Sequence, residues 1–184
     1  MDEKDTVQMA ANGDESAFEN LVRTYQSRVY AICLSMLKNP EDAEDAAQEA
    51  FVKCFRSMSA FRGDSSFYTW LCRLTMNVCL DALRAKKEAA ADIDECFDLA
   101  DEKEGVEDRV LREERRRVVR SAIGKLPVDF RMPLILRDMQ SLSYEEIGNA
   151  LDLSCGTVKS RLFRARDKLR EILMQSELFN EKNV

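Results

Sequence analysis

Hydrophobic residues recur at every third or fourth position along most of this chain, which is the spacing of amphipathic helices. In the first half, the spacing predicts three helices, beginning near Ser16, at Asn39 and near Ser66. Asn39 is a favoured helix cap, and Pro40 suits the first helical position. No segment bounded by turn signals alternates between apolar and polar residues as a half-buried strand would. The pattern therefore predicts an all-α fold.

Two short helices joined by a tight turn are predicted near the C-terminus. Ser143 and Glu146 have capping-box spacing, Asp152-Leu153 forms the turn, and Ser154 caps the second helix. Apolar residues fall on one side of that second helix: Val158, Leu162, Ala165 and Leu169. Basic residues largely occupy its other faces: Lys159, Arg161, Arg164, Arg166, Lys168 and Arg170. A helix-turn-helix presents its recognition helix to the DNA major groove in this way. The alternative is an ordinary amphipathic helix with a solvated charged face.

Charge divides the chain into two parts. The net charge is −6 over 184 residues, a length that suits one domain or two small ones. Residues 92–108 carry nine acidic residues against one lysine, whereas residues 159–170 carry six basic residues and one acidic. The acidic stretch is typical of a flexible linker, although a small folded element around Ile93, Phe97 and Leu99 is an alternative. The expected organisation is a tail at 1–13, a domain at 14–88, the linker at 89–109, a domain at 110–176 and a tail at 177–184.

The composition gives no support for a catalytic or metal-binding function. The chain has no histidine, and its six cysteines form no Cys-x-x-Cys pair. A phosphate-binding glycine loop is also missing from the sequence. We therefore predict no enzyme activity, no cofactor and no metal. No apolar run approaches the roughly 18 residues of a membrane span, and the acidic N-terminus is unlike a signal peptide. A cytoplasmic protein without membrane insertion is expected.

An aromatic loop joins the second and third predicted helices. Four aromatic residues lie between Phe61 and Trp70, around a Gly-Asp-Ser-Ser turn with Arg62 and Arg73 at its sides. This combination of aromatic residues and arginines is typical of sites that bind single-stranded DNA, because unstacked bases lie on aromatic faces while arginine contacts phosphates. The alternative is that the aromatic side chains close the core of a small domain. For Phe67 and Trp70 we favour the core, and for Phe61 a base contact.

Both halves resemble the extracytoplasmic-function (ECF) group of bacterial sigma factors. In the second half the motifs are LPVDFR at 126–131, LSYEEI at 142–147, GTVKSR at 156–161 and RAR at 164–166, which resemble sigma region 4. Residues 42–51 resemble region 2.2, and residues 61–78 resemble regions 2.3 and 2.4. Cys155 and Gly148 depart from this pattern, because proline and alanine are more usual there. The match covers about residues 14–88 and 110–172.

The resemblance implies three sets of site residues. The −35 element would be read by Arg137, Thr157, Lys159, Ser160, Phe163 and Arg164. The −10 element would be bound by Phe61, Arg62, Gly63, Asp64, Ser65, Trp70, Arg73 and Asn77. Core RNA polymerase would be bound by Asp45, Gln48 and Glu49.

The implied function is that of a sigma factor that directs core RNA polymerase to specific promoters and melts the −10 element. Its implied partners are core polymerase, promoter DNA and an anti-sigma factor, in the membrane or free of it. Two alternatives stay open at this point. A conventional helix-turn-helix regulator with a helical N-terminal interaction domain would bind a palindromic operator. A pure protein-interaction module would leave the cationic helix and the aromatic loop unexplained.

Overall fold

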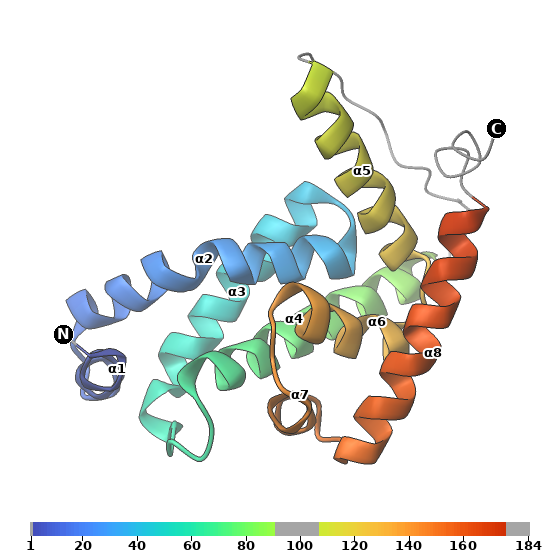
Figure 1. Ribbon diagram of the computed structural model, residues 1–184. Coiled ribbons are helices and arrows are strands. Elements are labelled where there is room, and N and C mark those ends of the chain that lie inside the picture. The colour runs from blue at the N-terminus through green and yellow to red at the C-terminus, as the bar shows by residue number, and fades with distance from the viewer. Residues whose placement is uncertain (1, 91–106, 176–184) are drawn as a thin grey trace.

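The computed structural model describes residues 2–90 and 107–175. The first half contains α1 (Glu3–Ala11), α2 (Glu15–Leu37), α3 (Pro40–Ser57), the 3-10 turn η1 (Met58–Ala60) and α4 (Phe67–Ala90). The second half contains α5 (Glu107–Gly124), α6 (Val128–Leu134), the π-helical turn η2 (Ile135–Met139), α7 (Tyr144–Leu151) and α8 (Cys155–Met174). The described residues include no strand, which confirms the predicted all-α fold (Figure 1). Most of the acidic segment predicted as a linker lies outside the described residues.

Local capping explains where the helices of the first half begin. The side chain of Asn39 accepts a hydrogen bond from the Asp42 amide at 3.0 Å, and Pro40 is the first residue of α3, as predicted. The Ser66 hydroxyl accepts from the Thr69 amide at 3.1 Å and starts α4. Asp14, rather than Ser16, caps α2 through the Ala17 amide at 3.0 Å. Helix α2 therefore begins slightly earlier than predicted, because the carboxylate of Asp14, two residues before Ser16, caps it.

The N-terminal segment, which the sequence analysis describes as a tail over residues 1–13, contains helix α1. Helix α1 packs against α2 with Val7 and Ala10 buried. The Tyr25 hydroxyl donates to the Glu3 carboxylate at 2.7 Å, which anchors the first turn of α1. A helix with so few buried apolar positions is stabilised mainly by tertiary packing, which a periodicity search does not detect.

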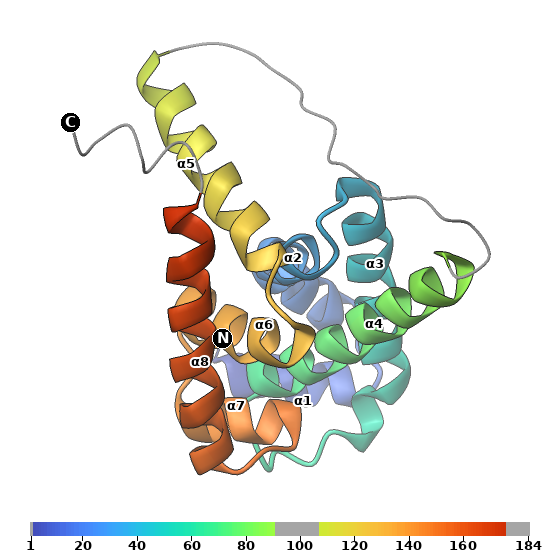
Figure 2. The same ribbon diagram turned by 90° about the vertical axis from the view of Figure 1, so that its right-hand side faces the viewer.

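The two halves pack against each other through one continuous hydrophobic core. Helix α7 lies on α4, and α5 and η2 contact α2 (Figures 1 and 2). Hydrogen bonds cross this seam. The Tyr68 hydroxyl donates to the Gln140 side chain at 2.6 Å, and the Thr69 hydroxyl donates to Glu146 at 3.4 Å. The sequence does not predict that the two halves pack against each other in this way.

A buried arginine ties the seam together. Arg131 of α6 is 7% exposed, and its guanidinium donates to the Met36 carbonyl at 2.8 Å. It also donates to the carbonyls of Gly124 at 2.6 Å and Leu126 at 2.8 Å. Met36 lies in the last turn of α2 and Gly124 ends α5, so one cation satisfies carbonyls at the C-terminal ends of helices from both halves. Burial lowers the pKa of Arg131, but arginine stays charged in proteins.

Replacing Arg131 with methionine is expected to destabilise the fold. Three buried carbonyls would lose a charged donor, and such a loss costs about 1.5–3 kcal/mol. In a chain of this size that lowers Tm by roughly 3–12 °C, measurable by thermal unfolding followed by circular dichroism. Arg23→Met is the control, because it removes only an exposed pair with Glu19 and should cost less than about 0.5 kcal/mol. Equal Tm shifts for the two variants would contradict the structural role of Arg131.

Candidate nucleic-acid interface

The predicted helix-turn-helix is formed by α7 and α8. Its capping box is confirmed: the Ser143 hydroxyl accepts from the Glu146 amide at 3.2 Å, and Glu146 accepts from the Ser143 amide at 2.8 Å. These hydrogen bonds from Ser143 to the carboxylate lower the pKa of Glu146 below its usual value. The Ser154 hydroxyl caps α8 through the Thr157 amide at 3.2 Å, also as predicted.

The turn between the two helices depends on Asp152 and Gly148. Asp152 is left-handed, with φ of 55°, and the Leu153 amide donates to the Gly148 carbonyl at 2.9 Å. A Cβ atom on Gly148 would lie 2.6 Å from the Leu153 carbonyl oxygen. Any side chain at this position would therefore push the turn outward, so the departure from alanine noted at Gly148 has a structural reason in this chain.

Helix α8 separates a buried face from an exposed one. Val158, Leu162 and Ala165 are fully or almost fully buried, as the spacing predicts. The opposite side is exposed and carries four of the predicted −35 residues: Lys159, Ser160, Phe163 and Arg164. Phe163 is the most exposed of the large hydrophobic residues of the described chain, with 70% of its surface accessible. Phe163 is thus a large apolar side chain exposed to solvent among cations. Exposed apolar groups of this kind are typical of a contact surface.

The two remaining predicted −35 residues border the same face. Thr157 is half-buried in the first turn of α8, where its hydroxyl lies 2.9 Å from that of Ser154. Arg137 is half-buried on η2 and donates to the Leu142 carbonyl at 2.7 Å. Its Cζ atom lies 5.0 Å from the ring centroid of Tyr144, and the Lys159 Nζ atom lies 5.9 Å from the same centroid. The structure thus brings Arg137 to the N-terminal half of α8.

The aromatic loop is a packed cluster with an exposed polar tip. Phe67 is buried, and the half-buried Phe61 ring lies 6.0 Å from Phe67 and 5.0 Å from Trp70 between ring centroids. Phe61 therefore packs with the core aromatics instead of standing free. Most of the other predicted −10 residues are exposed at the turn or on α4, with Ser65 and Trp70 half-buried: Arg62, Gly63, Asp64, Ser65, Trp70, Arg73 and Asn77.

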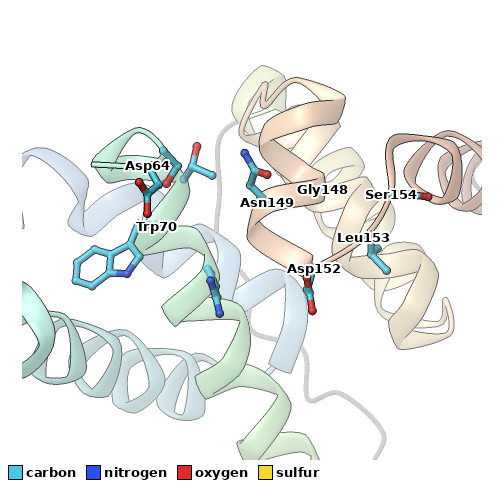
Figure 3. A pocket seen from close by; sticks show the side chains of 10 residues that line it. Asp64, Trp70, Gly148, Asn149, Asp152, Leu153 and Ser154 are labelled. Atoms are coloured by element: carbon cyan, nitrogen blue, oxygen red, sulfur yellow. The ribbon is translucent and has the colours of Figure 1, made fainter. Parts of the chain in front are cut away.

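A cavity of about 470 Å³ separates this loop from the helix-turn-helix. Asp64 and Trp70 line one wall, and Asn149 and Asp152 line the other (Figure 3). The surface predicted to take single-stranded DNA therefore faces the α7–α8 turn across a polar gap. Sequence reasoning missed Asn149 and Asp152 here, because only the packing of the two halves places them opposite the loop.

The predicted polymerase-binding residues lie on α3. Asp45, Gln48 and Glu49 are all exposed. Asp45 and Glu49 line an acidic groove of about 280 Å³ between α3 and α4. Lys53, which also lines this groove, pairs with Glu49 at 3.7 Å and with Asp81 at 3.8 Å.

Two further acidic residues of this groove were not predicted. Asp42 pairs with Lys86 and precedes Asp45 by one helical turn, so the spacing could have identified it. Asp81 comes from α4 and joins the groove only through packing of the two helices.

The described residues contain no cluster of metal-binding side chains and no helix long and apolar enough to cross a membrane. Burial raises the pKa of the Cys54 thiol to about 12 and that of the Cys72 thiol to about 12. Both groups are thus protonated at neutral pH and are poor nucleophiles.

Comparison with known proteins accounts for both halves. Residues 21–89 match the family Sigma-70 region 2, and residues 116–169 match Sigma-70, region 4. The chain is 39% identical over 172 residues to the ECF RNA polymerase sigma-E factor of Escherichia coli K12, which covers 89% of this chain and 90% of the relative. It is 37% identical over 176 residues to the RNA polymerase sigma-H factor of Pseudomonas aeruginosa, covering 91% of each. The chain belongs to the ECF sigma factors.

A solved structure agrees with this family in its fold. The structure of CnrH in complex with the cytosolic domain of CnrY has a TM-score of 0.73 and 26% identity, and it covers 95% of this chain and 99% of that chain. The resemblance stated from sequence motifs is thereby confirmed, and the regulator alternative receives no support. Region 2 corresponds here to α2, α3 and α4, and region 4 to the second half from α5 to α8.

Proposed function

We propose that this ECF sigma factor binds core RNA polymerase with α3, reads the −35 element with α8, and opens the −10 element with the loop after Phe61 and with α4. The observation that carries the proposal is the exposed row of Lys159, Ser160, Phe163 and Arg164 over the buried face of α8. The protein acts in the cytoplasm and has no catalytic role of its own. Residues 14–88 and 110–176 are the two functional domains, with the acidic segment 89–109 between them.

Recognition of the −35 element uses the N-terminal half of α8. Arg164 and Lys159 are long cations on the exposed face, and arginine or lysine can pair with the O6 and N7 atoms of guanine in the major groove. Phe163 offers an apolar surface that suits a thymine methyl group. Arg137 enters from η2 beside them. Arg170 lies about two turns further along α8, where a phosphate contact is the most it can make.

Opening of the −10 element uses the polar tip of the aromatic loop. An extruded base needs a platform and hydrogen-bonding groups on its edge. Phe61 packs on Trp70 and is held in place, which suits a stacking surface. Asn77 is exposed one turn beyond Arg73 on α4, and its amide can donate to and accept from a base edge.

Two protein partners complete the proposal. The acidic groove between α3 and α4 suits a basic helical surface of core polymerase, since complementary charge steers and orients association. CnrH, which shares this fold, was solved in complex with the cytosolic domain of CnrY. We extend this to an anti-sigma factor as a regulatory partner of the present chain. Run-off transcription with purified core polymerase and a promoter library tests the function as a whole, and no promoter-specific transcript would contradict it.

The orientation of α8 predicts unequal effects of two arginines. Arg164→Ala should reduce −35-dependent binding about tenfold or more and relax preference at one base pair, because a bidentate guanine contact discriminates by about 1–3 kcal/mol. Arg170→Ala should weaken binding slightly and evenly across promoters. Competition binding of holoenzyme to promoters permuted at each −35 position measures both effects. Equal losses for the two variants would mean that α8 is oriented differently.

The acidic groove predicts a loss of polymerase affinity on charge reversal. Glu49→Lys should weaken core binding several-fold with little change in Tm, because Glu49 is exposed and makes only one partly exposed ion pair. Glu19→Lys on α2 is a matched control, since Glu19 is also in an exposed pair with an arginine or lysine of its own helix. Affinity can be measured by titrating labelled sigma factor with core enzyme. A Glu49→Lys protein that binds like wild type would remove Glu49 from the interface.

The aromatic loop predicts a defect confined to strand opening. Phe61→Ala or Asn77→Ala should leave polymerase binding and −35 engagement nearly intact while lowering permanganate reactivity at the −10 element. A pre-melted bubble template should restore the part of the defect that is due to opening. Normal opening of a duplex promoter by both variants would leave the loop with a structural role only.

A further inference from the structure

Tyr144 is not among the predicted site residues, yet it lies between two of them. It is the first residue of α7 and is half-buried. The Arg137 Cζ atom lies 5.0 Å from its ring centroid, and the Lys159 Nζ atom lies 5.9 Å from that centroid. Arg137 comes from η2 and Lys159 from α8. The ring of Tyr144, on α7, therefore lies beside cations from two other elements.

Further contacts fix the same geometry. Arg137 donates to the Leu142 carbonyl at 2.7 Å, which anchors its guanidinium near the start of α7. The neighbouring Asp138 accepts two hydrogen bonds from Arg166 of α8, at 2.6 Å and 3.3 Å. Helix α8 is thereby tied to η2 at the residue next to Arg137. The ring of Tyr144 is held at the N-terminus of α7 by the capping box that begins at Ser143.

An aromatic face attracts a cation within about 6 Å of its centroid, most strongly when the pair is partly desolvated. Long basic side chains otherwise sample many rotamers, and binding DNA must order them. A ring that holds two cations near their working positions lowers this ordering cost. It adds no sequence information by itself, because it acts on the residues that touch the bases.

We infer that Tyr144 is a positioning residue of the −35 interface, whose ring pre-orders Arg137 and Lys159 for contact with duplex DNA. This inference rests on the proposed function of α8. The ring holds these two cations, whereas the hydroxyl interacts with Arg166. Tyrosine and phenylalanine should therefore hold Arg137 and Lys159 equally well, whereas leucine should not.

The variants Tyr144→Phe and Tyr144→Leu test this directly. Each is assembled with core polymerase and titrated against a fluorescein-labelled promoter duplex selected with the wild-type holoenzyme. Tyr144→Phe should bind within about twofold of wild type, and Tyr144→Leu should bind about threefold to tenfold more weakly, the size expected for one or two cation–π contacts. Lys159→Ala should cost less affinity in the Tyr144→Leu background than in wild type, because the pair is coupled.

A second measurement uses the free wild-type chain, so its main result does not depend on whether a variant folds. In the free wild-type chain, the ε-methylene protons of Lys159 should be shifted upfield by the ring current of Tyr144, and this shift should persist in Tyr144→Phe. Unshifted protons in wild type would overturn the inference. So would a Tyr144→Leu protein that binds like wild type, or a Tyr144→Phe protein as weak as Tyr144→Leu, which would assign the effect to the hydroxyl. Failure of the proposed function is distinct, because wild-type holoenzyme would then show no −35 dependence at all.

Discussion

The guanidinium of Arg131 is the contact on which the arrangement of the two halves depends. A buried cation is costly unless its hydrogen-bonding groups are satisfied, and here two of the three nitrogens donate to carbonyls, while the buried Nε atom has no hydrogen-bond partner. One acceptor, Met36, belongs to the end of α2, and the other two lie where α5 gives way to α6. Region 4 therefore cannot leave region 2 without exposing Arg131 and the end of α2 to water. Water can replace the Met36 carbonyl as an acceptor, so the separation is costly but not prohibitive.

The closed arrangement affects the two proposed DNA surfaces unequally. The outward face of α8 is free, because Lys159, Phe163 and Arg164 are exposed with the halves in contact. The aromatic loop instead faces the α7–α8 turn across the polar cavity, and the Thr69 hydroxyl donates to Glu146 of α7.

The sequence predicted most of what is local and little of what is long-range. Capping at Asn39, Ser143 and Ser154, the buried stripe of α8 and the all-α fold follow from neighbours within about one helical turn. Helix α1 was missed because its stability comes from packing on α2, including the bond from Tyr25 to Glu3. The seam was missed for the same reason, since residues such as Tyr68 and Gln140 meet only after both halves have folded.

The same distinction explains which parts of the proposed DNA interface can be derived from the sequence. Residues on the exposed face of α8 follow from helical spacing and charge alone, so their number and order were readable. Tyr144 was visible only as part of a capping motif, because its relation to Arg137 and Lys159 depends on how η2, α7 and α8 converge. In a small helix-turn-helix the side chains that touch DNA and those that hold them in place come from different elements. The exposed residues proposed to contact bases therefore follow from the sequence pattern, whereas the residue proposed to orient them is identified only in the packed structure.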